Sequence, residues 1–194
     1  MRWSQAALDK RVKSGVRISS EFGAGTASRA ATARQGTGSE KPARASGSDQ
    51  VQQVISSIRS ATCTGSHRRG EFMELFFRGA RTMGSNALMG LSHFQRIPVR
   101  DAWHEAVRWG VLELTKGPRH FDILKTYEIE ATRYSPSMVD TDAIDSHLKY
   151  PIDGMRYAGV IIDDNPKWFR RLISHQEIGE YGLRIVVRAV APVD

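Results

Sequence analysis

Aspartates gather in one short stretch of the chain, residues 140–164, which also contains Lys149. Carboxylates at this density repel one another unless a positive charge lies among them. The usual positive charge is a hard divalent cation, which prefers oxygen ligands. A lysine in the same stretch would then face a phosphate or a leaving oxygen. The stretch therefore predicts a magnesium-type site that acts on phosphodiesters.

The aspartates of this stretch fall into two groups. The first comprises Asp140, Asp142 and Asp145, and the second comprises Asp163 and Asp164. The first group follows an expected strand and the second follows the next expected helix, so we expect the hairpin between them to bring both groups around one cation. Such an ion polarises phosphate and lowers the pKa of a bound water. Lys149 would add a positive charge at the transition state.

The elements that must position these residues follow from hydrophobic periodicity. Apolar runs and alternation predict strands at residues 71–78, 121–134 and 183–190. Helical spacing predicts helices at 51–59, 99–114 and 145–157, whereas 167–173 fits either a strand or a short helix. This order predicts an α+β domain in which a small mixed sheet has helices packed on it.

Pro151 leaves the start of the 145–157 helix open. Proline inside a helix removes a backbone hydrogen bond and is tolerated only in the first turn or at a kink. If the helix begins near Tyr150, then Asp145 and Lys149 lie in the approach to it.

Composition limits the class of protein. The chain has 194 residues, of which 40% are hydrophobic and 25% charged, as in an ordinary globular protein. No apolar run has the length of a membrane span, and the N-terminus lacks the apolar core of a secretion signal. The single cysteine, Cys63, excludes an internal disulfide and a multi-cysteine zinc site. These features favour a cytoplasmic protein that does not contact the membrane.

The positive charge of the chain is concentrated in its first part. Residues 1–70 hold 12 Lys or Arg against 4 Asp or Glu, whereas residues 71–194 hold 16 against 17. The first part is also rich in Ser, Gly and Ala, so it could not bury enough surface to offset its ordering entropy. We expect residues 1–70 to form a mostly disordered basic arm, which either attracts DNA or serves as a solvated tail, and residues 71–194 to form the folded domain.

The stretch from Lys149 to Asp164, together with Asp145, resembles the RusA family of Holliday-junction resolvases of bacteria and prophages. The family signature is an Asp-x-Asp-Asn segment, a lysine four residues after its second aspartate, a further aspartate four residues later, then glycine and Asp-Asp. The matching residues here are Asp145, Lys149, Asp153, Gly159, Asp163 and Asp164. The order of the flanking elements is also similar, over roughly residues 71–190.

The resemblance implies a homodimer that binds four-way DNA junctions and introduces paired nicks with Mg²⁺ or Mn²⁺, in recombination and repair of phage or host DNA. By position, Asp145 and Asp164 would bind the metal, Lys149 would be the essential basic residue, and Asp153 would support the helix. Ala143 stands where the family has its first aspartate. Asp142 or Asp140 can supply that ligand instead, and we favour Asp142.

The leading hypothesis is thus a Mg²⁺-dependent DNA endonuclease with Asp142, Asp145 and Asp164 as ligands and Lys149 as the catalytic cation. One alternative is a catalytically inactive module that binds branched DNA. Another is a metal-dependent phosphohydrolase of smaller substrates, against which the basic arm argues.

Three further features have two interpretations each. Trp168 and Phe169 beside Arg170 and Arg171 suit either nucleic acid or an edge strand whose apolar side is buried. The Ser85-Asn86 pair either shapes a loop near the site or forms a plain turn. His147 either contacts a phosphate or lies on the surface.

Overall fold

The computed structural model describes residues 47–117, 126–163, 165 and 167–190, all within the compact unit Pro42–Asp194. Within these residues, a five-stranded sheet has the order β1-β2-β5-β3-β4. The strands are β1 (Thr62–Arg68), β2 (Phe72–Arg78), β3 (Tyr127–Ser135), β4 (Phe169–Ile178) and β5 (Gly182–Ala189). Only β3 and β4 pair in parallel among these neighbours. The sheet is mixed, and the expected α+β class is confirmed.

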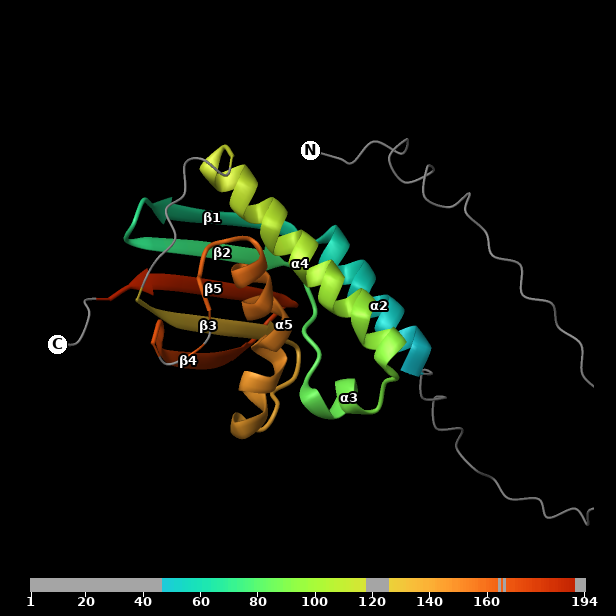
Figure 1. Ribbon diagram of the computed structural model, residues 1–194. Coiled ribbons are helices and arrows are strands. Elements are labelled where there is room, and N and C mark those ends of the chain that lie inside the picture. Colours follow the sequence, from blue (N-terminus) through green and yellow to red (C-terminus); the bar gives the residue numbers. More distant parts are fainter. Residues whose placement is uncertain (1–46, 118–125, 164, 166, 191–194) are drawn as a thin grey trace, which may run out of the picture. The chain divides into compact units, whose positions relative to one another are not determined.

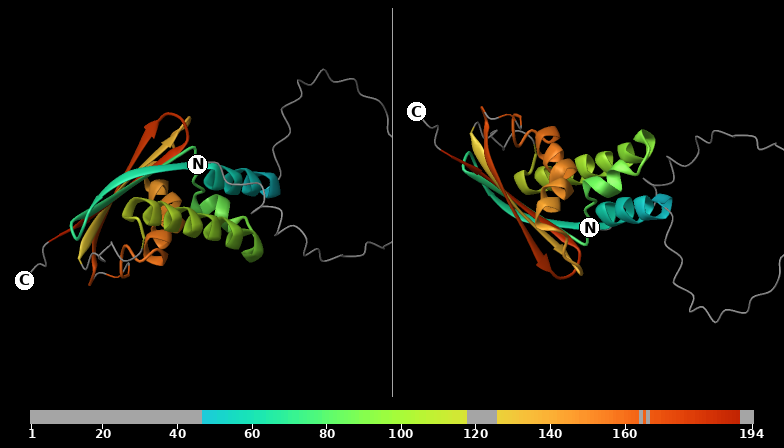
Figure 2. Two further views of the ribbon diagram at one scale, coloured as in Figure 1. Left: turned by 90° about the horizontal axis from the view of Figure 1, so that it is seen from above. Right: turned by 90° about the horizontal axis from the view of Figure 1, so that it is seen from below.

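The helices of the described residues lie on one face of this sheet (Figures 1 and 2). They are α2 (Gly47–Ser60), α3 (Ser85–Met89), α4 (His93–Thr115), the 3₁₀ turn η2 (Thr141–Ala143) and α5 (Ile144–Tyr157). None of the described helices combines the length and the apolarity that crossing a bilayer requires.

Strand alternation sets the core, because successive side chains of a strand point to opposite faces. On β2 the buried side chains alternate with partly exposed ones, and on β5 the other face also buries Val186. The side chains of these two strands that share the core face are Met73, Leu75, Phe77, Leu183, Ile185 and Val187. Trp103 of α4 is 1% exposed and meets the Phe77 ring edge-on, with centroids 5.6 Å apart. This contact joins the central helix to the sheet.

The helix α4 begins at His93, six residues before the expected start. Ser92 accepts a hydrogen bond from the Gln95 backbone N–H, and Gln95 Oε1 accepts one from the Ser92 backbone N–H, which together form a capping box. The cap lies before Pro98, which is therefore inside the helix.

The expected domain boundary at residue 71 is wrong, because residues 47–68 belong to the folded unit. The helix α2 buries Val51, Val54, Ile55 and Ile58 in the common core. The strand β1 pairs with β2 along its whole length. The polar sequence of β1 did not predict a strand, because β1 is an edge strand with no fully buried side chain. The expected disorder of residues 1–46 concerns residues outside those described.

The acidic stretch lies in a β3–α5–β4 crossover. Because β3 and β4 are parallel, the chain must return from the end of β3 to the start of β4, and α5 makes that return. The helix begins at Ile144, so Asp145 and Lys149 are helical and the later start near Tyr150 is wrong. Pro151 lies inside the helix, where it leaves the His147 carbonyl without its usual helical donor.

Candidate functional site

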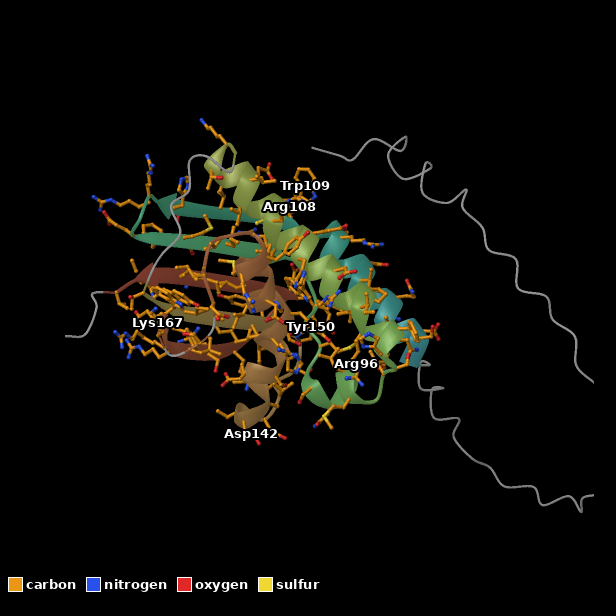
Figure 3. All side chains as sticks on the ribbon, viewed as in Figure 1. Arg96, Arg108, Trp109, Asp142, Tyr150 and Lys167 are labelled. Carbon is orange, nitrogen blue, oxygen red and sulfur yellow. The ribbon has the colours of Figure 1, made fainter. Side chains whose placement is uncertain are left out.

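Asp142 and Asp145 lie together at the N-terminal end of α5. The turn η2 contains Asp142 and runs directly into the first turn of α5, which contains Asp145. Both residues are exposed, and a spacing of three places them on the same side of the chain. Asp142 projects from the end of α5 that is remote from Lys167 (Figure 3). Two exposed carboxylates are therefore available at one place.

Lys149 continues the same stripe, since it follows Asp145 by four residues, and Asp153 follows by four more. Its Nζ lies 3.6 Å from Asp153 Oδ2, and its side chain is 66% exposed. Lys149 and Asp153 line a shallow hollow against β3 and β4. The other lining residues are Ile129, Ile152, Phe169 and Leu172. The ammonium group is thus placed beside the Asp153 carboxylate at the border of an apolar hollow.

Asp163 lies beyond the other end of α5. Its carboxylate pairs with Arg156 of the last helical turn, Oδ1 to Nη1 at 3.5 Å, and accepts a hydrogen bond from Asn165 Nδ2 at 2.9 Å. Its backbone carbonyl accepts a hydrogen bond from the hydroxyl of Tyr127, at the start of β3. These contacts hold Asp163 at the C-terminal end of α5, whereas Asp145 lies at the N-terminal end of the helix.

The hairpin does not bring Asp145 and Asp163 around one cation. Eleven residues separate Asp145 from Arg156, which is about 16 Å of helix at 1.5 Å per residue. Two oxygens on one Mg²⁺ lie within about 4 Å of each other, because each is about 2 Å from the ion. For Asp163 the expectation is wrong, because α5 continues through Pro151 at full length. Asp164 lies outside the described residues.

Among the residues that the structure describes, no group of three or more His, Cys, Asp or Glu side chains has the geometry of a metal site. Mg²⁺ needs fewer protein ligands than that, because it keeps several waters and commonly uses one or two carboxylates together with substrate phosphates. Asp142 and Asp145 fit this second arrangement.

A polar cluster that the sequence analysis did not foresee lies behind the N-terminal part of α5. Arg133 of β3 is 7% exposed; its Nε donates to Thr82 Oγ1 at 3.3 Å and its Nη1 to the Ser137 carbonyl at 3.1 Å. Thr82 Oγ1 is also 3.0 Å from His147 Nδ1. His147 is thus half-buried and bonded, so neither of its two interpretations anticipated the contact. The signal available in the sequence was only an arginine at an inward-facing strand position.

The segment that contains Ser85 contacts the N-terminal end of α5. The Ser85 backbone N–H donates to Ser146 Oγ at 3.0 Å, and that hydroxyl donates to the Ala143 carbonyl at 2.6 Å. Ser85 therefore shapes the surroundings of Asp145, as one of its two interpretations held, and residues 85–89 form α3 rather than a loop.

His147 should remain neutral down to an unusually low pH. Burial, followed by the charge of Arg133, lowers its pKa to about 4. Between pH 6.5 and 4 the unfolded chain binds a proton here and the folded protein does not, so the free energy of unfolding falls as pH falls. The partly exposed ring limits this loss to about 1–2 kcal/mol. We expect an NMR titration of the His147 imidazole to have its midpoint near pH 4, and a midpoint near 6.5 would contradict the cluster.

The edge strand β4 combines aromatic and basic side chains. The Lys167 ammonium lies 4.6 Å from the centroid of the Trp168 ring, and Arg170 and Arg171 are exposed. Arg171 pairs with Glu128, and Phe169 packs on Tyr127 with centroids 5.8 Å apart. The interpretation as an edge strand whose apolar side packs inward is confirmed for Phe169, and contact of the exposed cations with nucleic acid stays a prediction.

Comparison with known proteins adds no family, since no protein-family model matches the chain and no curated protein matches it.

Proposed function

We propose that this protein is a Mg²⁺-dependent endodeoxyribonuclease of the RusA type that cuts branched DNA. The observation that carries the proposal is the continuous exposed stripe of Asp142, Asp145 and Lys149 at the start of α5. Two carboxylates followed by a lysine on one helical face can present a cation and an ammonium group to the same phosphodiester.

The carboxylates of the stripe would bind the metal, and its lysine would bind the phosphate. Asp142 and Asp145 would hold Mg²⁺ through carboxylate oxygens, with water and a substrate phosphate completing its shell. The bound ion would supply Lewis-acid polarisation of the phosphate. Lys149 Nζ, on its flexible stem, would donate to a phosphate oxygen and stabilise the charge that develops there. Asp153 keeps the ammonium group near the hollow before substrate binds.

A RusA-like fold and a homodimer belong to the same proposal. The mixed sheet and the β3–α5–β4 crossover support the fold part, because the signature aspartates and lysine fall within that crossover. Paired nicks in a four-way junction need two sites that act on opposite strands, which one copy of this stripe cannot supply. The exposed cations Lys167 and Arg170 would contact backbone phosphates, so that binding weakens as salt rises.

The inactive DNA-binding module is the second candidate, and it gains support from Asp163 only if Asp163 rather than Asp164 must complete the site. If catalysis needs a third carboxylate beside Asp145, then the carboxylate of Asp163 is too far away, and it is engaged with Arg156 and Asn165. A protein that shifts junction DNA in gels but leaves no nicks in Mg²⁺ or Mn²⁺ would support this candidate.

Metal binding can be tested without any cleavage. Mn²⁺ is paramagnetic, so its bound fraction can be measured by electron paramagnetic resonance in the absence of DNA. We expect the Asp145→Asn variant to bind Mn²⁺ at least about tenfold more weakly than the parent chain, because a carboxylate is a better ligand for a hard cation than an amide.

Asp101→Asn is the matched control, since Asp101 lies on α4 and pairs with Arg100. It should leave Mn²⁺ affinity unchanged. Equal affinity of the Asp145→Asn variant and the parent would remove Asp145 from the metal site. Asp164→Asn, measured in parallel, tests whether the third expected ligand contributes.

A further inference from the structure

Arg133 is a buried cation without a counter-charge. It is 7% exposed, and among the described residues no carboxylate forms an ion pair with it. Burial lowers the pKa of its guanidinium, because a buried charged form loses contact with water. An unpaired charge in such a place costs several kcal/mol. An anion brought from outside the chain would offset this cost.

The guanidinium also retains free donors. It has five N–H groups, and Nε and Nη1 use one each for Thr82 and Ser137. Its Nη2 amino group makes no hydrogen bond within the described part of the chain. The one buried side-chain nitrogen or oxygen there that lacks a partner is His104 Nε2. Arg133 Nη2 is therefore not completely buried, although the residue as a whole is only 7% exposed.

Thr82 connects Arg133 to His147. Its hydroxyl oxygen accepts from Arg133 Nε–H at 3.3 Å and lies 3.0 Å from His147 Nδ1. The Nε2 side of the imidazole lies against Gly84. Arg133 thus supplies a free donor next to the N-terminal part of α5, whose dipole favours negative charge.

We propose that Arg133, Thr82 and His147 form a binding site for one phosphate-sized oxyanion, separate from the Asp142–Asp145–Lys149 stripe. Arg133 Nη2 donates the charge-assisted hydrogen bond, and Thr82 orients both Arg133 and His147. The oxyanion is either a backbone phosphate of a nucleic acid or a free phosphate, because both present the same oxygens.

The site can be tested with inorganic phosphate on the full chain. Binding would be followed by ³¹P NMR, with ionic strength held constant by chloride. We expect Arg133→Gln to weaken phosphate binding by about tenfold or more, since it removes a charge-assisted hydrogen bond. Arg184→Gln, which changes the same charge at an arginine paired with Glu74, should bind phosphate as the parent does.

Thr82→Val keeps the buried charge but removes the hydroxyl, so it tests the arrangement if Arg133→Gln fails to fold. It should weaken phosphate binding severalfold while both variants of the metal stripe, Asp142→Asn and Asp145→Asn, leave it unchanged. Phosphate affinity equal to that of the parent in Arg133→Gln or in Thr82→Val would overturn the proposal, as would binding no stronger than that of chloride.

The source of the oxyanion follows from DNA binding measured against salt. If the site takes a backbone phosphate, Arg133→Gln should reduce the slope of log affinity against log salt by about one, whereas a free-phosphate site leaves the slope unchanged. Once Arg133→Gln has been shown to lose phosphate binding, a reduced slope identifies a backbone phosphate as the ligand and an unchanged slope identifies a free phosphate. Because the phosphate arm uses no DNA and no metal, its failure is distinguishable from failure of the nuclease proposal.

Discussion

Replacing Lys149 with methionine should reduce cleavage of a four-way junction by about 10²–10³-fold, the usual effect of removing one group that stabilises transition-state charge. The fold should be unaffected. The side chain is 66% exposed, and its ion pair with Asp153 at 3.6 Å is a surface pair on a helix. Such pairs contribute about 0.3–0.5 kcal/mol. Methionine keeps the length of the apolar stem that borders the hollow, so only the charge is lost.

The measurement is a single-turnover cleavage rate at saturating protein, together with junction affinity from gel shifts. Lys167→Met is the matched control, because Lys167 is an exposed lysine remote from Asp142 (Figure 3). It should change the affinity and its salt dependence but not the saturated rate. If Lys149→Met cuts as fast as the parent, Lys149 is not part of the catalytic site.

Replacing Trp103 with alanine should lower the free energy of unfolding by about 3–5 kcal/mol, the cost of deleting a large buried aromatic. Its ring is 1% exposed against Phe77. Near it, α4 and α5 come so close that a Cβ on Gly154 would lie 2.9 Å from Val107 Cγ2 and 3.3 Å from the Trp103 carbonyl. Loss of this packing would loosen α5, and with it Asp145 and Lys149.

Urea unfolding compares this variant with Phe94→Ala on the same helix. Phe94 is 82% exposed, so its removal should change stability by no more than about 0.5 kcal/mol. A small loss in Trp103→Ala would show that α4 does not anchor the core as described.

Several elements were predictable because their side chains alternate or repeat strongly. The run from Phe72 to Phe77 and the run from Leu183 to Val187 are central strands, and the helix from Ile144 to Tyr157 was placed within one residue. The strand β1 and the start of α4 were not predictable in this way. One is a polar edge strand, and the other begins with a polar capping box rather than an apolar residue.

The candidate site was predictable only locally. Spacing alone places Asp142, Asp145 and Lys149 on one stripe, since that relation depends on helical geometry. The distance between Asp145 and Asp163 depends on the length and direction of α5. The sequence left the start of this helix open, because Pro151 lies inside the predicted range. Arg133 and Thr82 were missed because their contact joins residues 51 apart through a loop with no sequence signature.

The proposed nuclease activity can be measured as cleavage of a labelled four-way junction beside a linear duplex of matching sequence. Both would be incubated with and without Mg²⁺, using the parent chain and the Asp145→Asn and Asp164→Asn variants. We predict paired nicks on the junction only, dependent on Mg²⁺ and lost in Asp145→Asn. Equal nicking of the linear duplex, nicking without metal, or full activity of Asp145→Asn would contradict the account, whereas binding without any nick would establish the inactive module instead.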